Sequence, residues 1–333
     1  MNSIDSVFND FSHLNVLIIG DVMVDSYIWG DVGRISPEAP VPVMRIKTEE
    51  QRLGGAANVA RNVLALGARP ILCTVIGSDE NGRKFEQIMY KRGLEGNGII
   101  QSKDRITTVK ERLLSGSQHL LRVDREFEEQ LNRRDQRKLI DRAEELLKGA
   151  DVVIFEDYDK GVLNRSVIKT IVQMACDRGI PIVVDPKKKN FMSYKHVTLF
   201  KPNLKEIMEG LKVEFNVGDD QALSNAVGLL KEKLDIEMAL ITRSELGVYI
   251  DAEPEKFFLP AHIRAISDVS GAGDTVVSTA ALCLALDLPP YFIAGLSNLA
   301  GGLVCEHLGV VPVNKEQLQQ EALDNGLKVE GGR

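Results

Sequence analysis

Short apolar runs alternate with segments of helical period along the chain, and this alternation constrains the fold more than any other feature. Five runs have almost no polar alternation, which is typical of strands buried on both faces: 15–20, 69–76, 151–155, 181–185 and 238–242. Segments of helical period lie between or beside them, at 56–66, 81–92, 133–147, 165–178 and 219–234. Repeated strand-then-helix units favour right-handed βαβ crossovers. We therefore predict an α/β fold with a mostly parallel central sheet flanked by helices.

Two regions interrupt this alternation. Residues 26–47 combine three prolines with β-favouring valines, and residues 107–124 alternate around Ser115-Gly116-Ser117 as a hairpin does. We expect them to form one small β-sheet lid, from about 26–47 and 105–124, on a single domain of residues 1–326. The last residues, 327–333, are expected to be a disordered tail.

Composition and charge exclude several classes of protein. The 333 residues carry 41 Lys+Arg against 48 Asp+Glu, a net charge of −7, which argues against a general nucleic-acid binder. Apolar stretches are too short to span a membrane, and the N-terminus lacks a secretory pattern, so we expect a cytoplasmic protein. The four scattered cysteines are expected to be buried free thiols, and the five dispersed histidines show no metal-ligand spacing.

A glycine loop followed by a helical run gives the strongest chemical signal. Residues 268–275 read DVSGAGDT and lead into the apolar segment 276–286. Small residues at a helix start let backbone amides approach and bind phosphate, so Gly271, Ala272 and Gly273 are predicted to stabilise a transferred phosphoryl group. Asp274 is either a residue that favours a helix N-terminus or a general base that takes a proton from an attacking hydroxyl. We favour the general base.

Two further segments point to a polyol site. Gly54 and Gly55 precede an apolar helix whose first turn holds Asn58; the alternative is a tight turn with a surface asparagine. Asp21 and Asp25 follow the first predicted strand, where α/β sheets bind ligands and where carboxylates accept hydrogen bonds from sugar hydroxyls. One of these two aspartates could instead be a turn residue.

Together these segments resemble the ribokinase-like (PfkB) carbohydrate kinases. Residues 54–67 are similar to the family's first signature and residues 268–281 to its second, and the resemblance covers residues 12–322. It implies an ATP-dependent kinase with an α/β core and a β lid over the sugar. A catalytically idle sugar-binding regulator is the alternative from another class, and the retained Asp274 argues against it.

The resemblance also implies a nucleotide site. Its candidate residues are Asn203, Glu206, Thr242, Arg243, Gly247 and Asn298. From the residues alone, Asn203 and Glu206 read as a helix cap with its capping-box partner, and both roles can coexist. Mg²⁺ is expected to arrive with ATP, held through water near Glu206 and by no protein group directly. Potassium near Asp268 is compatible with the resemblance but not required by the residues.

Other segments are similar to the family's heptose 7-phosphate kinases. They include 34–43, 108–112, 121–124, 185–187 and 242–245. The likeness implies phosphorylation of D-glycero-D-manno-heptose 7-phosphate at C1, a step toward ADP-heptose for the lipopolysaccharide inner core. Other sugar, sugar-phosphate or nucleoside kinases of the family are the alternative.

A phosphorylated sugar needs cations at its far end. The candidates are Lys110, Arg122 and Lys187, with Arg112 on the same face as Lys110, and Asp124 belongs to the matching segment. Related kinases join two lids, so a homodimer through the lid is expected. Some carry a second, nucleotidyltransferase domain; here another protein supplies that activity or the sequence is part of a longer chain.

Overall fold

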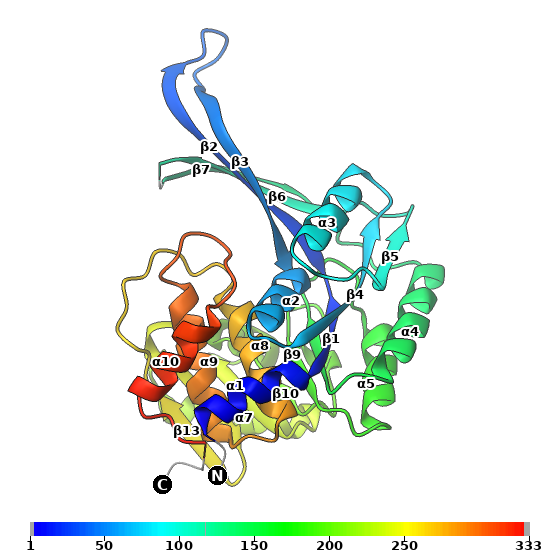
Figure 1. Cartoon of the computed structure of the whole chain (residues 1–333), viewed down its shortest axis with the longest axis vertical. Coiled ribbons are helices and arrows are strands. Elements are labelled where there is room, and N and C mark those ends of the chain that lie inside the picture. Colours follow the sequence, from blue (N-terminus) through cyan, green and yellow to red (C-terminus); the bar gives the residue numbers. More distant parts are fainter. Residues whose placement is uncertain (1–2, 117, 330–333) are drawn as a thin grey trace.

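The computed structural model describes residues 3–116 and 118–329 (Figure 1). Its helices are α1 Ile4–Asp10, α2 Ala56–Ala65, α3 Glu80–Lys91, α4 Arg133–Leu147, α5 Arg165–Cys176, α6 Leu204–Leu211, α7 Asp220–Leu234, α8 Ala272–Ala285, α9 Pro290–Val304 and α10 Lys315–Asp324. Its strands are β1 Asn15–Gly20, β2 Val22–Ile35, β3 Pro42–Gly55, β4 Arg69–Gly77, β5 Gly98–Ser102, β6 Thr108–Ser115, β7 Gln118–Arg125, β8 Val152–Glu156, β9 Ile182–Asp185, β10 Leu199–Phe200, β11 Met238–Thr242, β12 Val248–Ala252 and β13 Glu255–Leu259. No helix in these two stretches is long and apolar enough to cross a membrane.

A large sheet forms the centre of the molecule. Among the described residues its strand order is β13-β12-β11-β10-β9-β8-β1-β4-β5, parallel from β11 to β5 and antiparallel at the β11-β12-β13 edge. Successive residues of β1 enter opposite cores: Val16 and Ile18 pack with α2, α8 and α9, whereas Leu17 and Ile19 pack with α4, α5 and α7. This two-sided burial explains why β1 is apolar throughout, and it confirms the predicted α/β architecture.

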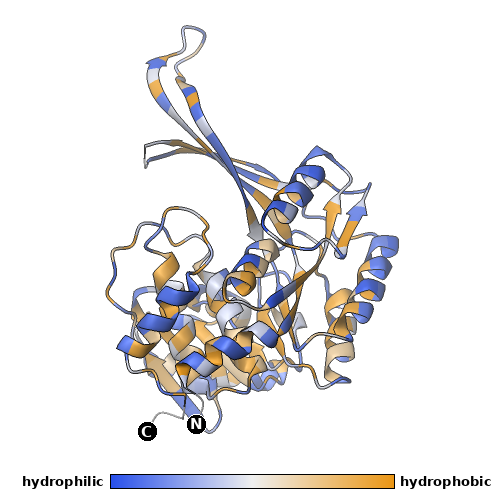
Figure 2. Ribbon diagram, viewed as in Figure 1, coloured by the Kyte–Doolittle hydropathy of each residue, from blue (hydrophilic) through white to orange (hydrophobic). Residues whose placement is uncertain are grey.

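The helices lie over the two faces of this sheet. In Figure 2, α4 and α10 alternate between hydrophilic and hydrophobic stretches, as surface helices with one buried side do. Helix α8 begins at Ala272, four residues before the predicted segment, because Gly271 at φ 81° supplies the turn that starts it. The first turn of α8 therefore already contains Gly273 and Asp274.

A second, smaller sheet stands off the main one. Its order is β3-β2-β6-β7, built from two separated segments of the chain, as expected. The first segment is wider than predicted, at 22–55, and the second runs from 108 to 125 instead of 105 to 124. The β2–β3 hairpin projects beyond the rest of the molecule (Figure 1). Strand β2 pairs in parallel with β6, and β6 pairs antiparallel with β7 around the predicted hairpin turn, of which Ser117 lies outside the described residues.

Two expectations need correction. Leu327 and Val329 pack against the main core, so the chain is ordered past residue 326, and the expectation of a tail from 327 is wrong as far as Val329. Residues 330–333 lie outside the described part. Three cysteines are buried as predicted, but Cys176, at the end of α5, is exposed.

Candidate active site

The carboxyl ends of β8, β9, β10 and β11 meet the N-terminus of α8 at one edge of the large sheet. Parallel strands place these ends side by side, which is where α/β proteins bind ligands. A cavity of about 1100 Å³ opens at this edge. Its wall includes the glycine loop 271–274 together with Tyr158, Asp185, Lys187 and Lys201. The glycine loop predicted to bind phosphate thus faces a cavity large enough for a nucleotide.

Asp274 lies in the first turn of α8 and is 4% exposed. Asn58 Nδ2 donates to its Oδ2 at 2.8 Å, and the Tyr158 hydroxyl donates to its Oδ1 at 2.8 Å. Burial raises the pKa of Asp274 to about 6, although these two hydrogen bonds oppose the rise. The carboxylate is therefore ionised at neutral pH, yet basic enough to take a proton. Asn58 is fully buried, so the surface alternative for this residue is wrong.

Three buried carboxylates share this position. One oxygen each of Glu156, Asp185 and Asp274 lies within 4.8 Å of the others. Both oxygens of Glu156, and Oδ1 of Asp185, have no hydrogen-bond partner among the described residues. Burial raises the pKa of Glu156 well above its usual range, and the Asp185 charge adds to the rise. Lys201 Nζ, 2.9 Å from Asp185 Oδ2, supplies one compensating charge.

Glu156, Tyr158, Asp185 and Lys201 were not singled out as functional residues in the sequence. Three of them follow or end predicted strands, which is the signal that could have found them. They line one site because β8, β9 and β10 are neighbours in the sheet.

The residues predicted for the nucleotide come together. All six line the large cavity: Asn203, Glu206, Thr242, Arg243, Gly247 and Asn298. Asn203 and Glu206 form the predicted capping box at the start of α6, in which Glu206 Oε2 accepts from the Asn203 amide at 2.8 Å. Glu206 Oε1 pairs with Lys187 Nζ at 2.7 Å. Both Glu206 oxygens are therefore engaged within the protein.

Arg243 and Asn298 shape the outer part of this cavity. Arg243 is 6% exposed, pairs with Asp220, and places its guanidinium 4.9 Å from the centre of the Phe258 ring. Asn298 Nδ2 donates to the Pro260 carbonyl at 2.8 Å. Asn298 thereby fixes the start of the loop that borders the cavity.

The residues predicted for the sugar divide into two groups. Asp25 is buried at the base of the lid and pairs with Arg112, which is also mostly buried. Lys110 lies on the same strand face as Arg112, with its Nζ 5.9 Å from the centre of the Tyr158 ring and 3.7 Å from Glu126 Oε1. Lys110 therefore faces the tyrosine whose hydroxyl donates to Asp274, whereas Arg112 is held by Asp25 at the base of the lid.

The second group lies elsewhere. The Arg122 side chain is 60% exposed on β7 and pairs with Asp124 at 3.0 Å, so Arg112, rather than Arg122, is the buried lid arginine. Lys187 pairs with Glu206 and lines the nucleotide cavity, and its contact with a sugar phosphate stays a prediction. The inward basic face of the lid therefore consists of Lys110 and Arg112.

Asp21 has a structural role. Its carboxylate accepts hydrogen bonds from the backbone amides of Tyr158, Lys160 and Val162 at 2.9, 3.0 and 3.0 Å. Of the two aspartates after β1, Asp21 is therefore the turn residue, and it fixes the loop that follows β8. Its predicted contact with sugar is not supported by this arrangement.

Gly54 and Gly55 allow the lid to join the core. A Cβ at Gly54 would lie 2.2 Å from Asp25 Oδ2, and one at Gly55, which has φ 61°, would lie 2.4 Å from the Asp21 carbonyl oxygen. The two glycines thus bring the backbone against both aspartates.

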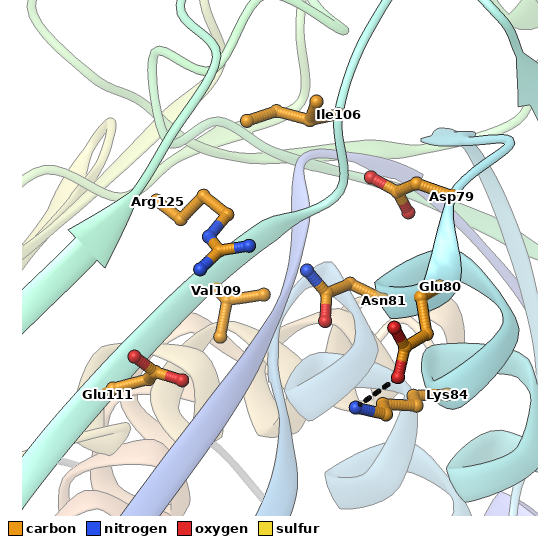
Figure 3. A pocket seen from close by; sticks show the side chains of 8 residues that line it. All are labelled: Asp79, Glu80, Asn81, Lys84, Ile106, Val109, Glu111 and Arg125. Atoms are coloured by element: carbon orange, nitrogen blue, oxygen red, sulfur yellow. Dashed lines mark ion pairs between the residues drawn. The ribbon is translucent and has the colours of Figure 1, made fainter.

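A second cavity, of about 370 Å³, lies between the N-terminus of α3 and strands β6 and β7. Figure 3 shows Asn81 from α3 and Arg125 from β7 pointing toward one another across it, beside the Glu80–Lys84 ion pair at 2.9 Å. Its lining mixes both charge signs and includes neither the glycine loop nor the buried carboxylates. The candidate catalytic residues therefore line the larger cavity.

Known proteins resemble this chain over most of its length. It is 42% identical over 309 residues to the bifunctional protein HldE of Caulobacter sp. (strain K31), and 36% identical over 303 residues to that of Helicobacter pylori (strain G27). These matches cover 92% and 91% of the chain but 62% and 65% of the relatives. The chain therefore spans less than two thirds of their length.

Solved structures share the fold. Phosphofructokinase-2 from Escherichia coli in complex with potassium superposes with a TM-score of 0.76 at 16% identity, covering 92% of this chain and 97% of that one. Arabidopsis thaliana ribokinase complexed with ribose and ATP gives 0.71 at 15% identity, covering 92% and 99%. The sequence profile of the pfkB family carbohydrate kinases matches residues 14–317. The chain therefore belongs to the pfkB family and is an ATP-dependent carbohydrate kinase.

Proposed function

We propose that this kinase transfers the γ-phosphate of ATP to the C1 hydroxyl of D-glycero-D-manno-heptose 7-phosphate. The observation that carries the proposal is the placement of Asp274, which lies between the nucleotide cavity and the basic face of the lid. Relatives named HldE and the heptose-kinase-like segments of the sequence support this substrate. The proposal covers the kinase step alone, since those relatives are longer.

In the proposed reaction, Asp274 takes the proton of the C1 hydroxyl as its oxygen attacks the γ-phosphorus. The bond from that phosphorus to the β,γ-bridging oxygen breaks, and ADP leaves. The amides of Gly271 and Gly273 at the start of α8 donate toward charge on the transferred group, and the Ala272 amide joins them by leaving the Val269 carbonyl, to which it donates at 3.3 Å in this structure. Positioning supplies most of the acceleration in such transfers.

The buried carboxylates fit the magnesium ion that accompanies ATP. Hard divalent cations prefer carboxylate oxygens, and Glu156 and Asp185 have oxygens without hydrogen-bond partners in the described chain. Glu206 is less suited because both its oxygens are engaged. We therefore place the ion at Glu156 and Asp185 rather than near Glu206. When bound, it offsets phosphate charge.

Potassium use stays a prediction. Asp268, beside which the resemblance allows potassium without requiring it, accepts from the amides of Ser270 and Gly309 at 2.9 Å each. A cytoplasmic location also stays a prediction from the sequence.

A second copy of the chain is the proposed partner of the lid. Apolar side chains on the projecting sheet are largely exposed: Ile35 61%, Val41 51%, Ile46 61% and Leu121 57%. Burying them against the same surface of a second copy removes this apolar area from water. We propose a homodimer through the two lids.

The test of substrate is an ADP-release assay with heptose 7-phosphate, free heptose and fructose 6-phosphate. The parent should use heptose 7-phosphate best, because Lys110 and Arg112 would otherwise be left without an anionic partner from the sugar. Lys110→Ala should narrow the preference for the phosphorylated over the free heptose. Lys47→Ala is the matched control, since Lys47 forms an exposed lid ion pair with Asp31. Equal use of free heptose or fructose 6-phosphate by the parent would contradict the substrate while leaving the kinase assignment intact.

A further inference from the structure

The loop after β8 brings a tyrosine to the general base. Tyr158 follows the last residue of β8 by two positions, and its hydroxyl donates to Asp274 Oδ1 at 2.8 Å. Asn58 holds the other oxygen, Oδ2, at the same distance. With each oxygen held by a donor from a different element, rotation of the carboxylate about its own axis is blocked.

The tyrosine is itself held in place. Asp21 accepts from the Tyr158 amide at 2.9 Å and from the amides of Lys160 and Val162, which fixes the backbone from Tyr158 to Val162. The ammonium groups of Lys187 and Lys110 lie 5.4 and 5.9 Å from the ring centre, within the range of cation–π attraction. The hydroxyl therefore has little freedom to leave Asp274.

Each carboxylate oxygen can accept two hydrogen bonds. The bonds from Tyr158 and Asn58 use one site on each oxygen and leave the others for an acceptor hydroxyl. We propose that Tyr158 is a positioning residue, which orients the Asp274 carboxylate so that a free lone pair faces the sugar hydroxyl. This inference rests on the proposed general-base role of Asp274.

The test compares Tyr158→Phe with the parent in steady-state kinetics on the best sugar of the panel. Removing one hydrogen bond to a charged group should lower kcat about 10- to 100-fold, while KM for the sugar stays within about threefold. In an Asp274→Asn background the same change should alter kcat by less than about twofold, because the two residues act as one unit. Equal losses of kcat in both backgrounds would overturn the inference.

Tyr194→Phe is the matched control. Tyr194 is fully buried, and its hydroxyl donates to Oδ2 of Asp157 at 2.7 Å. Asp157 precedes Tyr158 in the chain, but the Tyr194 hydroxyl is bonded to Asp157 and not to Asp274. The Tyr194→Phe variant should keep kcat within about threefold of the parent value, even if its free energy of unfolding is lower. If Tyr194→Phe lowered kcat as much as Tyr158→Phe does, any substitution of a buried tyrosine in this region would affect turnover. That result would also overturn the inference.

A measurement without turnover separates this inference from the kinase assignment. The ¹³C carboxyl resonance of Asp274, identified by its loss in Asp274→Asn, should move in Tyr158→Phe and stay unchanged in Tyr194→Phe. If the parent phosphorylates no sugar, the proposed function fails, and this resonance still decides on Tyr158. An unmoved resonance in Tyr158→Phe contradicts the positioning role.

Discussion

The side chain of Asp274 combines burial with two hydrogen-bond donors. Burial favours the neutral acid, whereas Asn58 and Tyr158 favour the carboxylate, and the outcome is a pKa of about 6. A surface aspartate would be a much weaker base. Burial thus makes the Asp274 carboxylate more basic, and the two hydrogen bonds offset part of the free-energy cost of removing its charge from water.

Replacing Asp274 with asparagine should lower kcat by about 100-fold or more, the scale expected for loss of a general base. Asparagine has the same shape but cannot take the proton. ATP affinity, measured by calorimetry, should stay close to that of the parent. Asp287→Asn is the control, since Asp287 is exposed just beyond the other end of α8. Turnover within a few-fold of the parent would remove Asp274 from the mechanism.

The activity should also depend on pH through this residue. Since the pKa of Asp274 is raised from 3.8 to about 6, the base is protonated and inactive below that value. Log kcat/KM, which reports the pKa values of the free enzyme, should therefore fall by about one unit per pH unit below pH 6 and level off above it. Rates between pH 5 and 8, with folding checked by circular dichroism, provide the measurement. A flat profile down to pH 5 would show that no group of this pKa limits turnover.

Among the elements, the junction of β3 with α2 decides how the lid joins the core. Gly55 has φ 61° and ψ −138°, a conformation that residues with a Cβ rarely adopt. Its neighbour Gly54 passes directly against Asp25. Strand β3 therefore leads into α2 close to the two aspartates that follow β1.

Gly55→Ala should lower the free energy of unfolding by about 1–3 kcal/mol, because the backbone is strained and the added Cβ meets the Asp21 carbonyl oxygen. Urea unfolding provides the measurement. Gly33→Ala, on β2 of the same sheet, is the control: its Cβ would have nothing within 4 Å, and its φ lies outside the left-handed region. Equal stability of the two variants would mean that the junction adjusts without cost.

On the scale of the whole molecule, a packed α/β body carries a thin sheet with a projecting hairpin (Figures 1 and 2). The body has cores on both faces of its large sheet, whereas no comparable core covers the distal part of the hairpin among residues 3–116 and 118–329. The unpaired edge strands of an exposed sheet of this kind favour association with a second copy of the chain.

Light scattering at tens of micromolar should return twice the mass of the chain. The double variant Ile46→Glu/Leu121→Glu should shift the protein to monomer, because charge at an apolar interface is costly to bury. Leu323→Glu is the control: Leu323 is an exposed leucine on α10, at 47% exposure, and its change to glutamate should leave the mass unchanged. A parent of monomer mass would contradict the lid dimer.

The sequence by itself determined the architecture and the residues that carry their own local signal. The apolar strands, the glycine loop before Asp274 and the capping box of Asn203 and Glu206 follow from periodicity and helix-end chemistry, which act over a few neighbouring residues. Only the tertiary structure decided the partners of Asp274. Asn58, Glu156 and Tyr158 lie more than a hundred positions from it, and no local pattern encodes the packing of strands and helices that brings them near. The same cause made Asp21 a loop anchor and left Arg122 exposed, because a side chain's role depends on which segment the fold places opposite it.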